Sequence, residues 1–302
     1  MTLRQIAGDL YRALAAPFGA RSLDRMLRDG LPPRLEAPLR FLFTGEAAPD
    51  VLALAAKIET RRAEIAGSDR TYQFTYARSA HGMARWPEPS RMESEEPALS
   101  SRWLAAASVP RRWGVFLHLC AMEARAIVEM GTCVGISGAY LASAPSRPRL
   151  VTLEGSAALA AIAEETLARF SDRTTIVRGP FESGIHRALA LLAAEQLKVD
   201  LAWIDGHHDE APTLHYVRTL LPHLSHGALV VLDDILLYAG MRRAWQQVSA
   251  MRGVAAAVNT GRFGLLLWHG GDAAPRHYDL ARHTGIWPSR KRDMPDPHAV
   301  AR

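Results

Sequence analysis

The sequence predicts an α/β fold, in which a doubly wound, mostly parallel sheet of seven strands with a reversed terminal strand follows a helical N-terminal segment. Three observations predict it. Apolar residues recur at helical spacing near the N-terminus, short apolar runs alternate with helical stretches from residue 108 onward, and a short turn joins the last two apolar runs. Alternation of this kind indicates βαβ units and a parallel sheet.

Residues 1–100 are expected to form the helical segment, followed by a lid or linker. One helical face collects Leu3, Ile6, Leu10 and Leu14. Residues 67–100 show no periodicity, and their composition fits a lid over a substrate as well as a linker. Several aromatic side chains there could stack on a ring or belong to a core: Tyr72, Phe74, Tyr76 and Trp86.

Residues 101–269 are expected to hold the sheet, and 270–302 a polar tail. Apolar runs predict strands at 127–130, 150–153, 174–177, 199–204 and 228–232. Helices are predicted between them, near 137–144, 156–169, 183–197, 210–222 and 240–251. The last two strands, 254–258 and 263–268, are joined by a hairpin-like turn that holds Arg262.

Composition indicates an ordinary globular chain, 48% hydrophobic and 22% charged. No apolar run approaches the roughly 18 residues of a membrane span, and no signal-peptide pattern opens the sequence. Cys120 and Cys133 are too few for a disulfide framework. We therefore expect a cytoplasmic protein without membrane contact. The net charge of +5 comes mainly from scattered arginines, a pattern that does not favour a nucleic-acid partner.

A glycine-rich turn and an acidic strand end predict a nucleotide site. Gly131 and Gly135 follow the first strand, where glycine lets the backbone turn tightly and approach a ligand. Glu154 ends the second strand, where a carboxylate can accept both hydroxyls of a ribose. A glycine turn without a ligand and a solvated acidic strand end remain the alternative. A dinucleotide fold would need a glycine at Cys133, and Glu129 before the turn would repel a pyrophosphate. A carboxylate there suits the cationic methionine end of S-adenosylmethionine.

The run E-M-G-T-C-V-G-I-S from Glu129 to Ser137 resembles the first motif of class I S-adenosylmethionine-dependent methyltransferases. L-E-G-S at Leu153–Ser156 resembles their ribose-binding motif, and the terminal hairpin resembles the reversed last strand of their Rossmann-like domain. The resemblance implies a set of cofactor contacts at Glu129, Gly131, Thr132, Gly135, Ser137, Glu154, Gly155, Glu182 and Asp205.

Three aspartates end the fourth and fifth strands and are expected to meet at the same sheet edge: Asp205, Asp233 and Asp234. Three carboxylates in one cleft repel each other unless they are protonated, paired or neutralised by a cation. Oxygen ligands suit Mg²⁺ or another hard divalent cation. The sequence therefore predicts a metal site. The alternative is one carboxylate that contacts the cofactor and two that cap helices, without a metal.

I-D-G-H-H from Ile204 to His208 and L-D-D-I from Leu232 to Ile235 resemble bacterial small-molecule O-methyltransferases of the catechol and macrocin types. The resemblance implies catalytic roles for Asp205 and for a histidine base, with His207 in the usual position and His208 as its rival. A neutral histidine can accept a proton near neutral pH. One histidine could instead cap the next helix, with neither titrating usefully.

The sequence thus predicts methyl transfer from S-adenosylmethionine to a hydroxyl of a small molecule, assisted by a divalent metal. The N-terminal helices and the 67–100 segment are expected to build the acceptor pocket, with a homodimer as one arrangement. Three alternatives remain open. They are a nucleic-acid methyltransferase, a nicotinamide-dependent oxidoreductase and a non-catalytic protein that binds S-adenosylmethionine.

Overall fold

The computed structural model describes residues 3–68, 70–72, 75–77, 93–95, 99–237 and 239–284. Two aromatic residues singled out in the sequence, Phe74 and Trp86, lie outside the described residues, as does the side chain of Tyr76.

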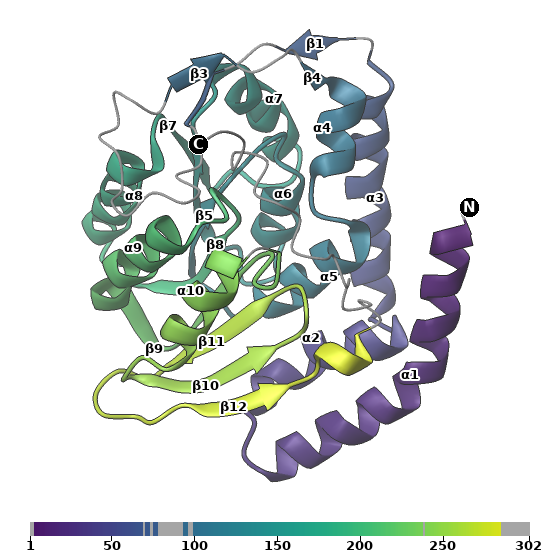
Figure 1. Ribbon diagram of the computed structural model, residues 1–302. Coiled ribbons are helices and arrows are strands. Elements are labelled where there is room, and N and C mark those ends of the chain that lie inside the picture. Colours follow the sequence, from purple (N-terminus) through teal and green to yellow (C-terminus); the bar gives the residue numbers. More distant parts are fainter. Residues whose placement is uncertain are drawn as a thin grey trace, which may run out of the picture.

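A sheet of eight strands forms the centre of the molecule (Figure 1). Five parallel strands lie side by side in the order β7 (Thr174–Arg178), β6 (Arg149–Glu154), β5 (Ala126–Met130), β8 (Val199–Ile204) and β9 (Leu224–Leu232). The order of the strands reverses at β5, as in a doubly wound sheet. Their carboxyl ends therefore share one edge, as predicted.

The sheet continues beyond β9 with a reversed strand. β11 (Gly264–Trp268) pairs antiparallel with β9, and β10 (Val254–Asn259) pairs antiparallel with β11. The predicted reversed strand is therefore confirmed, and it lies between β9 and β10. An eighth strand, β12 (Arg276–Asp279), pairs parallel with β10. This strand was not predicted, because it is mostly polar and, of its four side chains, only that of Tyr278 is buried.

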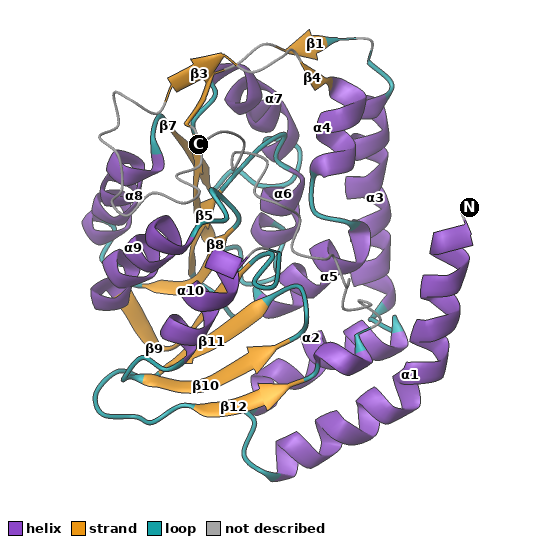
Figure 2. Cartoon of the chain, in the orientation of Figure 1, coloured by secondary structure: helices purple, strands orange, loops and turns teal. Residues whose placement is uncertain are grey.

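Helices cover both faces of the sheet (Figure 2). One face packs against α5 (Arg111–Cys120), α6 (Ile136–Ala142) and α7 (Ala157–Leu167). The other packs against α8 (Phe181–Ala194), α9 (Glu210–Leu220) and α10 (Ala239–Ser249). Because both faces are covered, the central strands are buried almost continuously. This explains why they appear in the sequence as unbroken apolar runs.

The N-terminal segment packs on the α5 side of the sheet. It holds α1 (Leu3–Arg28), α2 (Glu36–Thr44) and α3 (Pro49–Ala66), and α4 (Ser101–Ala107) follows it. Leu39, Leu42 and Ile58 are fully buried and belong to the same hydrophobic core as Phe116 of α5. The helices are therefore part of the main core. In the part of the chain that the structure describes, no helix is both long and apolar enough to cross a membrane.

Short elements complete the described chain. Two small antiparallel pairs stand apart from the main sheet, namely β1 (Thr71–Tyr72) with β4 (Leu99–Ser100), and β2 (Thr75–Ala77) with β3 (Glu93–Glu95). The 3₁₀ turns among the described residues are η1 (Pro33–Leu35), η3 (Leu221–His223) and η4 (Ala281–His283).

Candidate active site

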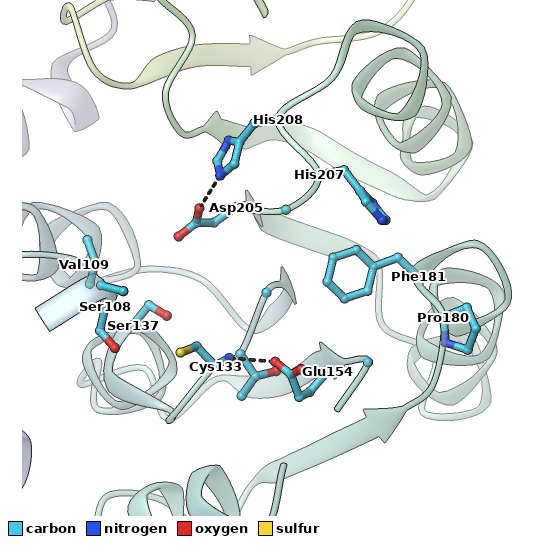
Figure 3. A pocket seen from close by; sticks show the side chains of 15 residues that line it. Ser108, Val109, Cys133, Ser137, Glu154, Pro180, Phe181, Asp205, His207 and His208 are labelled. Atoms are coloured by element: carbon cyan, nitrogen blue, oxygen red, sulfur yellow. Dashed lines mark hydrogen bonds and ion pairs between the residues drawn. The ribbon is translucent and has the colours of Figure 1, made fainter. Parts of the chain in front are cut away.

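A cavity of about 340 Å³ opens at the carboxyl edge of the sheet (Figure 3). Eight of the residues predicted from the sequence line it: Gly131, Thr132, Ser137, Glu154, Gly155, Asp205, His207 and His208. Five others predicted for the site are not among its lining residues: Glu129, Gly135, Glu182, Asp233 and Asp234. The other lining residues were not among the predicted site residues, and they are Ala107, Ser108, Val109, Cys133, Pro180, Phe181 and Gly206.

The glycine turn after β5 lies against the loop after β8. Gly131 has φ +104°, and a Cβ there would lie 2.1 Å from the carbonyl oxygen of Asp205. Gly135 has φ +84° and is the N-cap of α6. A Cβ at Gly135 would lie 3.1 Å from the Cα of Ala163 in α7. Both positions therefore need glycine, the first for the approach of two loops and the second for helix packing.

Glu154 ends β6 with its carboxylate held by the backbone. Its two oxygens accept hydrogen bonds from the amides of Cys133 and Ser156, each at 2.8 Å. The side chain is buried, and burial raises the pKa of Glu154 to about 7, although the amide hydrogen bonds lower it. Because each carboxylate oxygen has a second lone pair, Glu154 can accept further hydrogen bonds from a ligand in the cavity.

Glu129 lies on β5, two residues before Gly131 of the glycine turn, and is completely buried. Among the described residues, neither of its oxygens has a hydrogen-bond partner of ordinary geometry. Burial raises the pKa of Glu129 to about 7, and the nearby hydroxyls of Ser137 and Thr152 lower it only in part. A buried carboxylate without a partner is costly in free energy. It is therefore a ready partner for a cationic group that enters from the cavity beside Ser137.

Phe181 and His207 form a second end of the cavity. Their rings meet edge to face, with centroids 5.4 Å apart. Tyr216 donates its hydroxyl hydrogen to Oε1 of Glu182 at 3.0 Å, and Nδ1 of His207 lies 2.8 Å from the same hydroxyl oxygen. Since a hydroxyl carries one hydrogen, Nδ1 of His207 is the donor in the second bond. Glu182 thus orients the hydroxyl group of Tyr216, which in turn binds the ring of His207.

Asp205 and His208 face each other where β8 ends. Nε2 of His208 lies 3.4 Å from Oδ1 of Asp205. Burial lowers the pKa of His208, but the neighbouring carboxylates of Asp205, Asp233 and Asp234 outweigh it and raise the pKa to about 9. Burial and the nearby Asp233 raise the pKa of Asp205 to about 6. In Figure 3 the ring of His208 points toward Asp205, whereas that of His207 points away.

The donor set of the predicted metal site does not fit a divalent cation well. Asp233 is buried, and its two oxygens accept hydrogen bonds from Nε and Nη2 of Arg262 at 2.8 and 2.7 Å. Nε of Arg262 also lies 3.8 Å from Asp234. The described residues contain no group of three histidine, cysteine or acidic side chains placed to hold a metal ion. The repulsion between the aspartates is relieved by an arginine that the sequence did not connect with them.

At the end of α4 and just beyond it, the cavity is lined by Ala107, Ser108 and Val109. Arg62 of the N-terminal segment binds backbone carbonyl groups there. Arg62 in α3 donates from Nη1 to the carbonyl oxygen of Ala105 at 2.6 Å, and from Nη2 to that of Val109. Nε of Arg62 pairs with Glu59 at 2.8 Å. The N-terminal segment therefore supports the backbone that lines this part of the cavity, whereas its expected role in an acceptor pocket stays a prediction. Nothing in the local pattern around residues 105–109 distinguishes them from an ordinary helix end.

One comparison with known proteins covers the part of the chain that holds most of this site. Residues 128–235 match a family model described as a methyltransferase domain. The matched stretch runs from β5 to the residue after Asp234, so it contains the glycine turn, Glu154 and the two histidines. The chain therefore carries a methyltransferase domain. No curated protein sequence matches the chain.

Solved structures with detectable similarity include several cofactor complexes. The O-methyltransferase TomG from Streptomyces achromogenes, in complex with SAM, is 26% identical over 54% of this chain and 82% of its own, with a TM-score of 0.46. An O-methyltransferase from Bacillus cereus, in complex with SAH, is 25% identical over 55% and 87%, with a TM-score of 0.46. A cofactor-bound protein from MTB is 24% identical over 80% and 99%, with a TM-score of 0.49.

Proposed function

We propose, from the methyltransferase domain that residues 128–235 form, that this protein transfers a methyl group from S-adenosylmethionine to a hydroxyl group of a small molecule. The observation that carries the proposal is a pair of buried carboxylates next to the glycine turn. Glu129 precedes the turn on β5, and Glu154 at the end of β6 accepts a hydrogen bond from the amide of Cys133 in the turn. One lacks a partner and the other lines the cavity.

These residues fit the two polar ends of the cofactor. The amino group of its methionine part is cationic and would give Glu129 the partner that it lacks. The ribose hydroxyls are donors and would reach Glu154, whose oxygens already orient toward the amides of Cys133 and Ser156. The ring of Phe181, beside Pro180, offers an apolar surface to the adenine. A dinucleotide would instead bring a pyrophosphate toward Glu129, where like charges repel.

The reaction needs the chain to place the acceptor oxygen and remove its proton. When bound, S-adenosylmethionine supplies a methyl group whose bond to sulfur breaks as the bond to oxygen forms, leaving S-adenosylhomocysteine. His208 is our choice for the base, because it stands in the cavity and is held by Asp205 at 3.4 Å. His207 is instead held by Tyr216 beside Phe181, which suits a role in positioning.

Calorimetric titration with S-adenosylhomocysteine tests the cofactor. We expect the wild-type protein to bind it and Glu154→Gln to bind it roughly 10- to 150-fold more weakly, the range for hydrogen bonds to a charged group. Glu123→Gln, at an exposed position, is the matched control and should bind as the wild type does. Failure of the folded wild type to bind would contradict the proposal.

Transfer of a labelled methyl group tests the acceptor. We expect the label from S-adenosylmethionine in the small-molecule fraction when phenols, catechols, sugars and hydroxy acids are offered. The label in RNA, together with RNA binding that falls steeply with salt, would favour the nucleic-acid alternative. Cofactor binding without transfer to any class would favour the non-catalytic alternative.

A further inference from the structure

Arg262 is built firmly into the turn between β10 and β11. Because β10 runs parallel to the central strands, this turn lies at the same edge of the sheet as Asp205 and Asp233. The carbonyl oxygen of Arg262 accepts a hydrogen bond from the amide of Ile235 at 3.1 Å, which ties the turn to the loop after β9. The guanidinium lies over the ring of Phe263, 5.5 Å from its centroid. Its position is thus fixed by backbone and side chain together.

The guanidinium binds both carboxylate oxygens of Asp233, the atoms through which this side chain would bind a metal ion. The two bonds from Nε and Nη2 to the two carboxylate oxygens, at 2.8 and 2.7 Å, form a fork that matches the planar carboxylate. Asp233 is only 2% exposed, so solvent screens this pair little. A divalent ion on the same carboxylate would stand within a few ångströms of a permanent positive charge, where repulsion in a poorly screened site is strong.

The other two aspartates also have partners from the chain. Oδ1 of Asp205 faces Nε2 of His208 at 3.4 Å, and Asp234 lies 3.8 Å from Nε of Arg262. The charge that a metal would supply is therefore distributed over side chains that the fold holds in place. Three neighbouring carboxylates need positive charge beside them. Here Arg262 and His208 supply it, so no cation from solution is required.

We propose that Arg262 replaces the divalent cation of this site, so that methyl transfer proceeds without a metal ion. The inference rests on the proposed function, since it concerns the same reaction. Arg262 acts as a positioning residue, because it holds Asp233 and through it the loop beside Asp205 and His208. The acceptor then needs only one hydroxyl group, because no metal is present that two adjacent oxygens would chelate.

Binding of Mn²⁺, followed by electron paramagnetic resonance in the presence of S-adenosylhomocysteine, tests the proposal without an acceptor. We expect no Mn²⁺ binding to the wild type at micromolar concentrations. Arg262→Met should gain Mn²⁺ affinity by more than about tenfold, because the repelling charge is gone. Adding Asp233→Asn should remove that gain. Arg218→Met, on the exposed side of α9, is the control and should behave as the wild type.

Each remaining outcome decides between the two proposals. Micromolar Mn²⁺ binding by the wild type, or transfer that EDTA abolishes and Mg²⁺ restores, would overturn the role of Arg262 and leave the proposed function standing. Folded Arg262→Met without any gain in Mn²⁺ affinity would also overturn it. If Arg262→Met does not fold, the wild-type measurements and Arg262→Lys decide, since lysine keeps the charge and should still exclude Mn²⁺. Absence of cofactor binding by the wild type would contradict the proposed function instead.

Discussion

Replacing Glu129 by glutamine should make the protein more stable and its cofactor binding weaker. The carboxylate is fully buried, and no hydrogen-bond partner is found for it among the described residues. Burial raises its pKa from 4.5 to about 7. Because one pKa unit corresponds to 1.36 kcal/mol, the ionised carboxylate costs the folded protein about 3 kcal/mol. Glutamine has a similar size and carries no charge, so this cost disappears.

The sign of the pH dependence follows from the raised pKa. The folded state binds the proton of Glu129 more tightly than the unfolded state, so its contribution to stability is full below pH 4.5 and is lost as the pH rises to about 7. Glu129→Gln should therefore match the wild type at low pH and exceed it above pH 7. The expected gain at pH 8 is roughly 5–10 °C in Tm for about 3 kcal/mol in a chain of this size.

Cofactor binding should change in the opposite direction. At pH 8 the amide of Glu129→Gln cannot form an ion pair with the amino group of S-adenosylhomocysteine, and we expect a loss of roughly 10- to 150-fold in affinity. The wild type should also release a proton on binding below pH 7, which calorimetry in two buffers detects. Differential scanning calorimetry gives Tm, and Glu123→Gln is the exposed control. A variant that is less stable at pH 8, or that binds as tightly as the wild type, would refute the reasoning.

Three further predictions follow from the geometry of the site. Gly131→Ala should lower the free energy of unfolding by about 2–5 kcal/mol in thermal unfolding, because its φ is +104° and a backbone oxygen lies 2.1 Å from the added carbon. Gly155→Ala is the control and should leave stability unchanged, because its added carbon meets nothing within 4 Å. Transfer by the wild type should rise with pH to about 9, because the base must be neutral and the pKa of His208 is about 9. His208→Asn should reduce the rate by roughly 10²- to 10⁴-fold near pH 9 and remove this rise with pH, and a variant with the wild-type rate and pH profile would end its candidacy. Arg62→Met should lower stability by about 1–3 kcal/mol and weaken cofactor binding, since Arg62 binds the carbonyl groups of Ser108 and Val109, which line the cavity. Unchanged binding in calorimetry would contradict this link.

The sequence was sufficient for features that depend on local pattern. The strand ends at Glu154 and Asp205 could be located because buried parallel strands are continuous apolar runs, and the shared edge follows from their direction. The reversed last strand was visible as two apolar runs across a short turn. Gly131 was predicted to lie in a tight turn after the first strand, and its φ of +104° agrees with such a turn.

Features that depend on distant contacts could not be predicted in the same way. Arg262 lies 29 residues from Asp233, and only the insertion of β11 beside β9 brings the two together. The sequence did hold one indication of this contact. A turn that follows a strand parallel to β9 must lie at the same edge of the sheet as Asp233, which follows β9. Strand β12 was missed because its residues are mostly exposed and only Tyr278 faces the core.

The two ends of the described chain are fastened to each other. Nη1 of Arg276, in β12, donates a hydrogen bond to the carbonyl oxygen of Asp29 across 247 positions of sequence, at 2.8 Å. Ser22 of α1 and His283 of η4, 261 positions apart, meet at 3.2 Å. During synthesis on the ribosome, α1 emerges long before these partners exist. The last part of α1 therefore completes its contacts only after nearly the whole sheet has been translated. In a stalled or shortened chain, the surface of α1 that contacts β12 and η4 stays exposed to other proteins in the cell.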